Sequence, residues 1–176
     1  MKNIIAFAGS NSKKSINKQL VIYASGFLEE AKVSVLDLND YPLPIYGVDK
    51  EAESGIPENA AKFLDKIKKA DGIAVSLAEH NGNFTVAFKN IIDWMSRIEQ
   101  KVWHNKPMLL LSTSPGGRGG ASSMSIAKNG FPHMGANVIA NFSLPKFYDN
   151  FKDGRVVNEE FNQKIKEAVT TFQKAV

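Results

Sequence analysis

Five short apolar runs, each followed by a segment with apolar residues at helical spacing, limit the folds open to this 176-residue chain. The runs span 4–8, 32–38, 73–78, 107–112 and 137–144. No hairpin signal connects one run to the next. Repeated strand–helix units of this kind predict an α/β domain, in which a five-stranded parallel sheet carries helices on both faces. The mixed polar and apolar residues of 137–144 predict an edge strand.

The segments between the runs predict helices with one apolar face. The first helix is expected to begin near Asn17 and to carry Leu20, Ala24, Phe27, Leu28 and Ala31. Later helices are expected to begin near Pro57, to include Phe84 and Trp94, and to cover 121–130 and about 159–174. The stretch with Gly47 and Gly55 is predicted to be a loop, and 145–157 to be the least regular part of the chain. Its aromatic residues, Phe147, Tyr148 and Phe151, are candidates to cover a pocket or a subunit interface.

Composition excludes several classes of function. The chain has no cysteine, which rules out disulfides, thiolate metal sites and cysteine catalysis. Its net charge of +4 comes from scattered lysines, which indicates a solvated basic surface and no nucleic-acid partner. No stretch approaches the roughly 20 apolar residues of a membrane span, and the first run is too short for a signal peptide. We expect one cytoplasmic domain covering 1–176.

The turn after the first run, 9–17, is rich in hydroxyl and amide groups. Such groups, with free backbone N–H groups at a helix start, can hold a phosphate. The candidates are Ser10, Ser12, Ser15 and Asn17. An alternative is that Ser15 only caps the helix. The turn contains neither Gly-Lys-Ser nor Gly-x-Gly-x-x-Gly, so we expect no ATP site and no Rossmann-type nucleotide site here.

Two more polar turns follow the third and fourth runs. The first offers Glu79, His80, Asn81, Gly82 and Asn83 to the edge of a planar ring, although His80 alone also fits a surface turn. The second offers Ser114, Pro115, Gly116 and Gly117 to the same ring. The nearby Arg118 either balances negative charge on the ligand or is a solvated side chain. In a parallel sheet these turns meet at the carboxyl edge, where open α/β folds bind ligands. Together they favour one flat, anionic, aromatic ligand, which we interpret as flavin mononucleotide (FMN).

Several motifs resemble those of a known family. A Gly-Ser-x-Arg-x-x-Ser-x-Asn loop is matched at Gly9, Ser10, Ser15 and Asn17. An acidic-aromatic-Asn-Gly turn followed by Leu-Lys-Asn-Ala-Ile-Asp-Trp is matched at Glu79, Asn81, Gly82, Lys89, Asn90, Ile92, Asp93 and Trp94. By these motifs the chain resembles the NADPH-dependent FMN reductases, a flavodoxin-like group that includes quinone, azo-dye and chromate reductases. It departs from them at Ser12, where the family has arginine, and at His80, where it has tyrosine.

The resemblance implies a flavodoxin-like three-layer sandwich with strand order 2-1-3-4-5. It implies FMN with its phosphate on Ser10, Ser15, Ile16 and Asn17, and its ring between the 79–83 and 114–117 turns. Hydride would pass from NADPH or NADH to FMN and on to a flavin, quinone, azo compound or metal oxyanion. The chemistry is the cofactor's, so we assign no catalytic residue and no metal ligand. A homodimer or homotetramer with its site near the interface is also implied.

Two other functions stay open on the sequence. One is a flavodoxin-like electron carrier, which the positive net charge and Gly9-Ser10 disfavour. The other is a flavin-binding or regulatory module without turnover, which Ser12 and His80 keep open. Fold-level similarity does not separate them.

Overall fold

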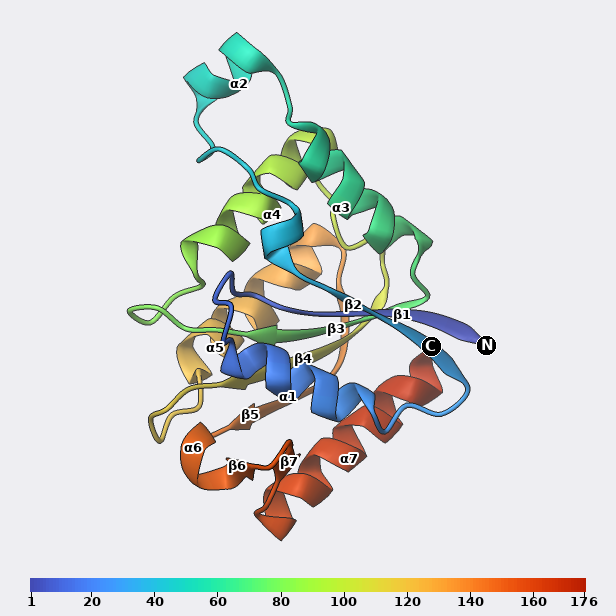
Figure 1. The fold of residues 1–176 in the computed structure, drawn as a ribbon. Helices are drawn as coiled ribbons and strands as arrows, with labels where there is room; N and C mark the ends of the chain where they lie inside the picture. The colour runs from blue at the N-terminus through green and yellow to red at the C-terminus, as the bar shows by residue number, and fades with distance from the viewer.

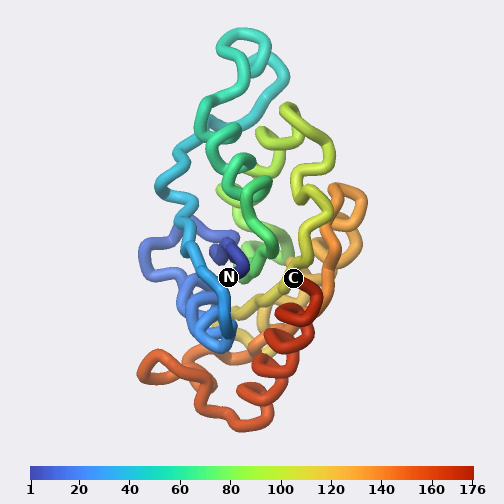
Figure 2. Tube along the Cα trace, turned by 90° about the vertical axis from the view of Figure 1, so that its right-hand side faces the viewer, coloured from blue at the N-terminus to red at the C-terminus, as the bar shows by residue number.

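A computed structural model describes all 176 residues and contains one five-stranded parallel sheet of order β2-β1-β3-β4-β5 (Figure 1). The strands are β1 Lys2–Ala8, β2 Ala31–Leu36, β3 Gly72–Leu77, β4 Pro107–Thr113 and β5 Asn137–Leu144. The predicted strand order is confirmed, and β5 is an edge strand as expected. Both termini lie near the amino ends of the central strands (Figures 1 and 2).

Helices cover both faces of the sheet, which confirms the three-layer sandwich. The helices are α1 Ile16–Ser25, α2 Val48–Ser54, α3 Glu58–Lys69, α4 Val86–Ile98, α5 Ala121–Gly130, α6 Phe147–Asn150 and α7 Glu159–Ala175, with 3-10 turns η1 Leu38–Asp40 and η2 Phe131–Met134. One apolar core joins α3, α4 and α5 to the sheet, and the other joins α1 and α7 to its opposite face.

Strand β1 shows how one short apolar run supplies both cores. Successive side chains of a strand point to opposite faces. Ile5 and Phe7 therefore enter the core under α3 and α4, whereas Ile4 and Ala6 enter the core under α1 and α7. A strand buried on both faces needs apolar residues throughout, which is why its sequence shows no polar alternation.

Two predicted helix boundaries were wrong, and the second strand, predicted over 32–38, is Ala31–Leu36, with Leu38 in η1. Helix α1 ends at Ser25, so Phe27 and Leu28 lie in the following turn and Ala31 begins β2. The Gly26 N–H still donates to the Ile22 O, but the next N–H groups, of Phe27 and Leu28, bond to the carbonyls three residues back, so the α-helical pattern ends there. Helix α4 begins after Phe84, because the Thr85 Oγ1 accepts from the Phe88 N–H at 3.2 Å and caps it.

The two segments expected to be irregular contain regular elements. The predicted loop around Gly47 and Gly55 contains α2, which has no buried residue and projects from the body of the molecule (Figure 1). The 145–157 segment contains α6 and an antiparallel hairpin of β6 Phe151–Lys152 and β7 Arg155–Val156. This hairpin lies after the fifth run and forms a separate two-stranded sheet, so the five runs are still joined without hairpins.

Candidate functional site

The three polar turns predicted to form a site meet at the carboxyl edge of β1, β3 and β4. They enclose an open pocket of about 340 Å³. The pocket is lined by Ser10, Ser12, Lys14, Ser15, Ile16, Asn17, Ala78, Glu79, His80, Thr113, Ser114, Pro115 and Tyr148. Ala78 directly follows β3, Thr113 ends β4, and Tyr148 comes from α6. Nine of the residues predicted as cofactor ligands thus face one cavity.

Asn81, Gly82, Asn83, Gly116 and Gly117 do not line this pocket. Asn81 and Gly82 have φ values of 51° and 77° and form the centre of a tight turn. The turn is closed by two hydrogen bonds, from the His80 N–H to the Asn83 O at 2.9 Å and back from the Asn83 N–H to the His80 O at 3.0 Å. Left-handed backbone suits glycine and asparagine, so these residue types specify the turn.

The turn after β1 presents two free backbone donors at the start of α1. The Ser15 Oγ accepts from the Lys18 N–H at 3.1 Å, so Ser15 caps the helix, and it also lines the pocket. The N–H groups of Ile16 and Asn17 have no acceptor within the chain. They lie at the positive end of the helix dipole and line the pocket, which makes this an anion-binding geometry.

The side chain of Asn17 is engaged within the protein. It is 2% exposed, and its Nδ2 donates to the Thr113 O at 3.1 Å. Its Oδ1 accepts from the Ser76 Oγ at 2.7 Å and from the Thr113 N–H at 3.0 Å. The carboxamide therefore ties α1 to the ends of β3 and β4, and only the backbone N–H of Asn17 is left to meet a ligand.

The carboxylate of Glu79 is also engaged. Its Oε2 accepts from the Ser122 N–H at 2.8 Å and from the Ser123 N–H at 3.0 Å, at the start of α5. A carboxylate there is favoured by the helix dipole. Glu79 thus holds the turn after β3 against the helix that follows the turn after β4.

Arg118 does not face the pocket. It is exposed, and its Nη2 donates to the Ser122 Oγ at 3.0 Å. The turn that carries Arg118 is fixed to β4, because the Ser112 Oγ donates to the Gly119 O at 2.7 Å. No three His, Cys, Asp or Glu side chains converge on a metal-binding geometry anywhere in the structure.

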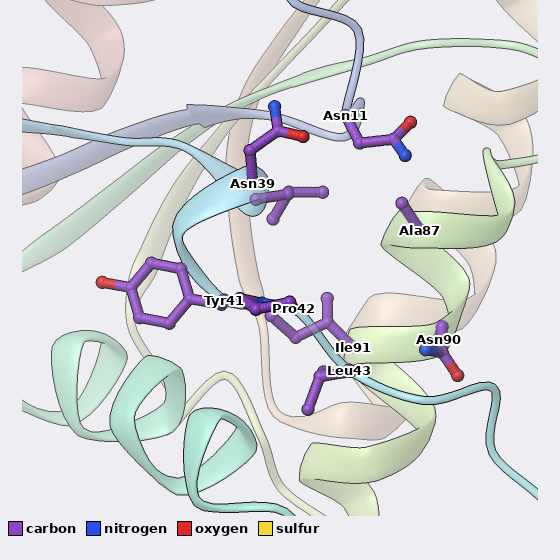
Figure 3. A pocket seen from close by; sticks show the side chains of 9 residues that line it. Asn11, Asn39, Tyr41, Pro42, Leu43, Ala87, Asn90 and Ile91 are labelled. Carbon is purple, nitrogen blue, oxygen red and sulfur yellow. The ribbon is translucent and has the colours of Figure 1, made fainter.

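A second cavity of about 220 Å³ lies on the other side of the first turn (Figure 3). In Figure 3 Asn11 and the α4 residues Ala87 and Asn90 lie opposite Asn39 and the segment that carries Pro42 and Leu43. This segment, residues 41–46, is called the strap. No site was predicted there from the sequence.

Two motif residues on α4 hold the strap in place. The Asn90 Oδ1 accepts from the Tyr46 N–H at 2.8 Å, and its Nδ2 donates to the Pro44 O at 3.0 Å. The Nε1 of the fully buried Trp94 donates to the same Pro44 O at 2.8 Å. The matched motif of residues 89–94 was the signal that could have identified this contact.

The main pocket has the features that a flavin phosphate requires. Two residues with free helix-start amides, Ile16 and Asn17, and the hydroxyl-bearing Ser10 and Ser15 belong to its lining. Pro115 and Tyr148 provide apolar surface elsewhere in its lining. In sheets of this order, FMN binds at the switch point between the first and third strands, where this pocket lies. Fold and site together define a flavodoxin-like protein of the FMN-binding class.

Comparison with known proteins gives the family. The profile of the family described as NADPH-dependent FMN reductase matches residues 2–149, and the chain belongs to this family. The probable NADPH:quinone oxidoreductase 1 of Oryza sativa subsp. japonica is 29% identical over 181 residues, covering 97% of this chain and 89% of the relative. The 2-hydroxy-1,4-benzoquinone reductase of a Burkholderia species is 30% identical over 154 residues, covering 87% and 81%.

A solved structure extends the agreement to three dimensions. The flavoenzyme NAD(P)H:(acceptor) oxidoreductase of Paracoccus denitrificans superposes with a TM-score of 0.77 at 27% identity, covering 99% of this chain and 97% of that chain. The protein is thus a flavin-dependent NAD(P)H oxidoreductase. The predicted cofactor, FMN, and the predicted donor, a reduced nicotinamide nucleotide, are confirmed at the level of the family.

Proposed function

We propose that the protein oxidises NADPH or NADH and reduces a small quinone, with FMN held in the pocket between the three turns. The observation that carries this proposal is the pair of free amides, of Ile16 and Asn17, at the start of α1 inside that pocket. Quinone is the acceptor class named for the relatives from Oryza and Burkholderia. Flavins, azo compounds and metal oxyanions are the other acceptors that an exposed flavin face can serve.

Different residues would contact the phosphate and the ring of FMN. Ser10, Ser12, Ser15 and the backbone of Ile16 and Asn17 would hold the phosphate. The turns at 79–83 and 114–117 would flank the ring, with His80 on one side and Ser114 and Pro115 on the other. Bound FMN supplies the hydride transfer, so the chain needs no catalytic residue of its own.

We propose that residues 1–176 form one FMN-binding domain and that the protein is located in the cytoplasm, where reduced nicotinamide nucleotides are available. The two apolar cores meet at one continuous sheet, which supports a single domain. None of the helices has the length and apolar character required to cross a bilayer. Nothing in the pocket calls for a nucleic acid or a membrane as partner.

We also propose that the protein is a homodimer that pairs through the strap and α2. Ile45, Val48 and Val86 are 67%, 73% and 67% exposed, and Ile45 and Val86 line one cavity beside the turn at 79–83. Large exposed apolar side chains in one place are typical of an interaction surface. The surface lies next to the flavin site, so a second copy would help to cover that site.

Sedimentation tests the dimer. We expect a mass of twice 19.3 kDa for the wild type and of 19.3 kDa for Val48→Asp, which places a charge in the apolar surface. Ile126→Asp is the control, because Ile126 is a partly exposed residue of α5, away from the strap. A monomeric wild type, or a dimer that survives Val48→Asp, contradicts this interface.

The visible absorption spectrum tests the function. Protein mixed with equimolar FMN and desalted is expected to stay yellow, to bleach with anaerobic NADPH, and to regain its colour when a quinone is added. Bleaching without repeated turnover would favour an electron carrier. A colourless protein after desalting would favour a module that has lost its flavin and would overturn the proposed mechanism.

A further inference from the structure

The first turn and the start of α1 carry three lysines in six residues, and the structure separates their roles. Lys18 lies within 2.5 Å of the Asp37 carboxylate. Burial alone would raise the pKa of Asp37, but the hydrogen bonds from Lys18 and Asn39 outweigh it and lower this pKa below its usual value. Lys18 is therefore committed to an ion pair within the protein.

Lys13 and Lys14 are neighbours with different surroundings. Both are exposed, and neither has a carboxylate within ion-pair distance. Lys14 lines the pocket, whereas Lys13 does not. The backbone of Lys14 is oriented by the turn itself, because its N–H donates to the Ser12 Oγ at 3.3 Å.

The charge balance of the pocket points to Lys14. Its lining contains two residues with full charges, Lys14 and Glu79, and the Glu79 carboxylate is already bonded to two amides of α5. Ser12, which stands where an arginine was expected, is neutral, and its Oγ accepts the Lys14 N–H. A phosphate here would meet the helix-start amides and would have one cationic side chain available.

We propose that the Lys14 ammonium neutralises the cofactor phosphate and so makes this site selective for FMN over riboflavin, which has the same ring and no phosphate. This inference rests on the proposed function, since it takes FMN as the ligand. A charge-assisted contact to phosphate is stronger than a neutral hydrogen bond. Because Lys14 is exposed to solvent, salt will screen part of its contribution.

Titration of FMN and of riboflavin against the protein, followed by quenching of flavin fluorescence, tests the inference. Lys14→Gln is expected to weaken FMN binding about tenfold, since one charge-assisted hydrogen bond is lost, and to leave riboflavin binding unchanged. Lys13→Gln, the matched control, is expected to change neither. Lys14→Arg keeps the charge and is expected to retain FMN binding.

The outcomes separate the two proposals. A wild type that binds neither flavin overturns both the proposed function and the role of Lys14. Tight FMN binding that is insensitive to Lys14→Gln, or equal losses for FMN and riboflavin, overturns the role of Lys14 alone. Equal losses in Lys13→Gln and Lys14→Gln would also overturn it, because they would indicate a general effect of surface charge.

Discussion

Replacing Asn17 with alanine is expected to lower the midpoint of thermal unfolding by about 8 °C and to weaken FMN binding. The substitution removes three hydrogen bonds of a buried carboxamide and leaves the Thr113 N–H, the Thr113 O and the Ser76 Oγ without their partner. Unpaired buried polar groups of this kind cost about 3 kcal/mol in total. For a chain of this size each kcal/mol corresponds to roughly 2–4 °C.

The expected loss of FMN affinity has a different origin from the loss of stability. Alanine keeps the backbone N–H at position 17, so any direct contact of that amide with a phosphate survives. The substitution removes the link that sets the start of α1 against the turn after β4. FMN binding then weakens because the two walls of the pocket are no longer fixed relative to each other.

Thermal melting and flavin titration, carried out on the same variants, check this prediction. Asn59→Ala is the control, because Asn59 is a half-buried asparagine that donates one hydrogen bond, to the Pro42 O at 2.9 Å. It should melt close to the wild type and bind FMN normally. If Asn17→Ala melts like Asn59→Ala but loses FMN, the carboxamide contacts the ligand directly and our assignment is wrong.

Asn17 also marks the limit of what the sequence could predict. The alternation of apolar runs and helical segments predicted the parallel sheet and the meeting of the three turns, because parallel strands bring their carboxyl ends to one edge. The strand order was predicted by the family resemblance. A polar residue at a helix start looks the same in sequence whether it faces a ligand or the core. Its partners Ser76 and Thr113 are 59 and 96 residues away, so only the folded chain reveals them.

The strap and the 151–156 hairpin were missed for a related reason. The strap is held by Asn90 and Trp94, which are 44 to 50 residues later in the chain. The hairpin strands have two residues each, too few to show an alternating pattern. Its Asp153-Gly154 turn, with φ values of 50° and 75°, was the available signal. Local pattern therefore predicted the long elements and missed the strap, which is held by distant side chains, and the hairpin, whose strands are too short.

The second large effect is expected for Gly119→Ala, at the base of the turn after β4. Gly119 has a φ of 57°, and a Cβ placed on it would lie 2.8 Å from both the C and the O of Leu144 and 3.0 Å from the Pro145 N. These are backbone atoms at the end of β5, which cannot rotate away as a side chain can. The left-handed backbone adds strain for any residue with a Cβ.

Either the turn or the end of β5 must therefore move to accommodate the alanine. Strain and overpacking together are expected to cost about 3 kcal/mol. The displaced turn carries Ser114 and Pro115, which line the pocket, so FMN binding should fall as well. From the sequence, Gly116 and Gly117 of this turn were predicted to lie beside the flavin ring. At Gly119 the requirement for glycine is instead the close approach of the β5 backbone.

Gly117→Ala separates this cause from a general intolerance of the turn. The backbone of Gly117 is not left-handed, and a Cβ there would come no closer than 4.0 Å, to the flexible Lys146 side chain. We expect this variant to unfold within about 0.5 kcal/mol of the wild type in urea and to bind FMN normally. Equal losses of stability in the two variants would mean that the flexibility of the turn, rather than its contact with Leu144, requires glycine. A stable Gly119→Ala protein would show that the end of β5 can move away without cost.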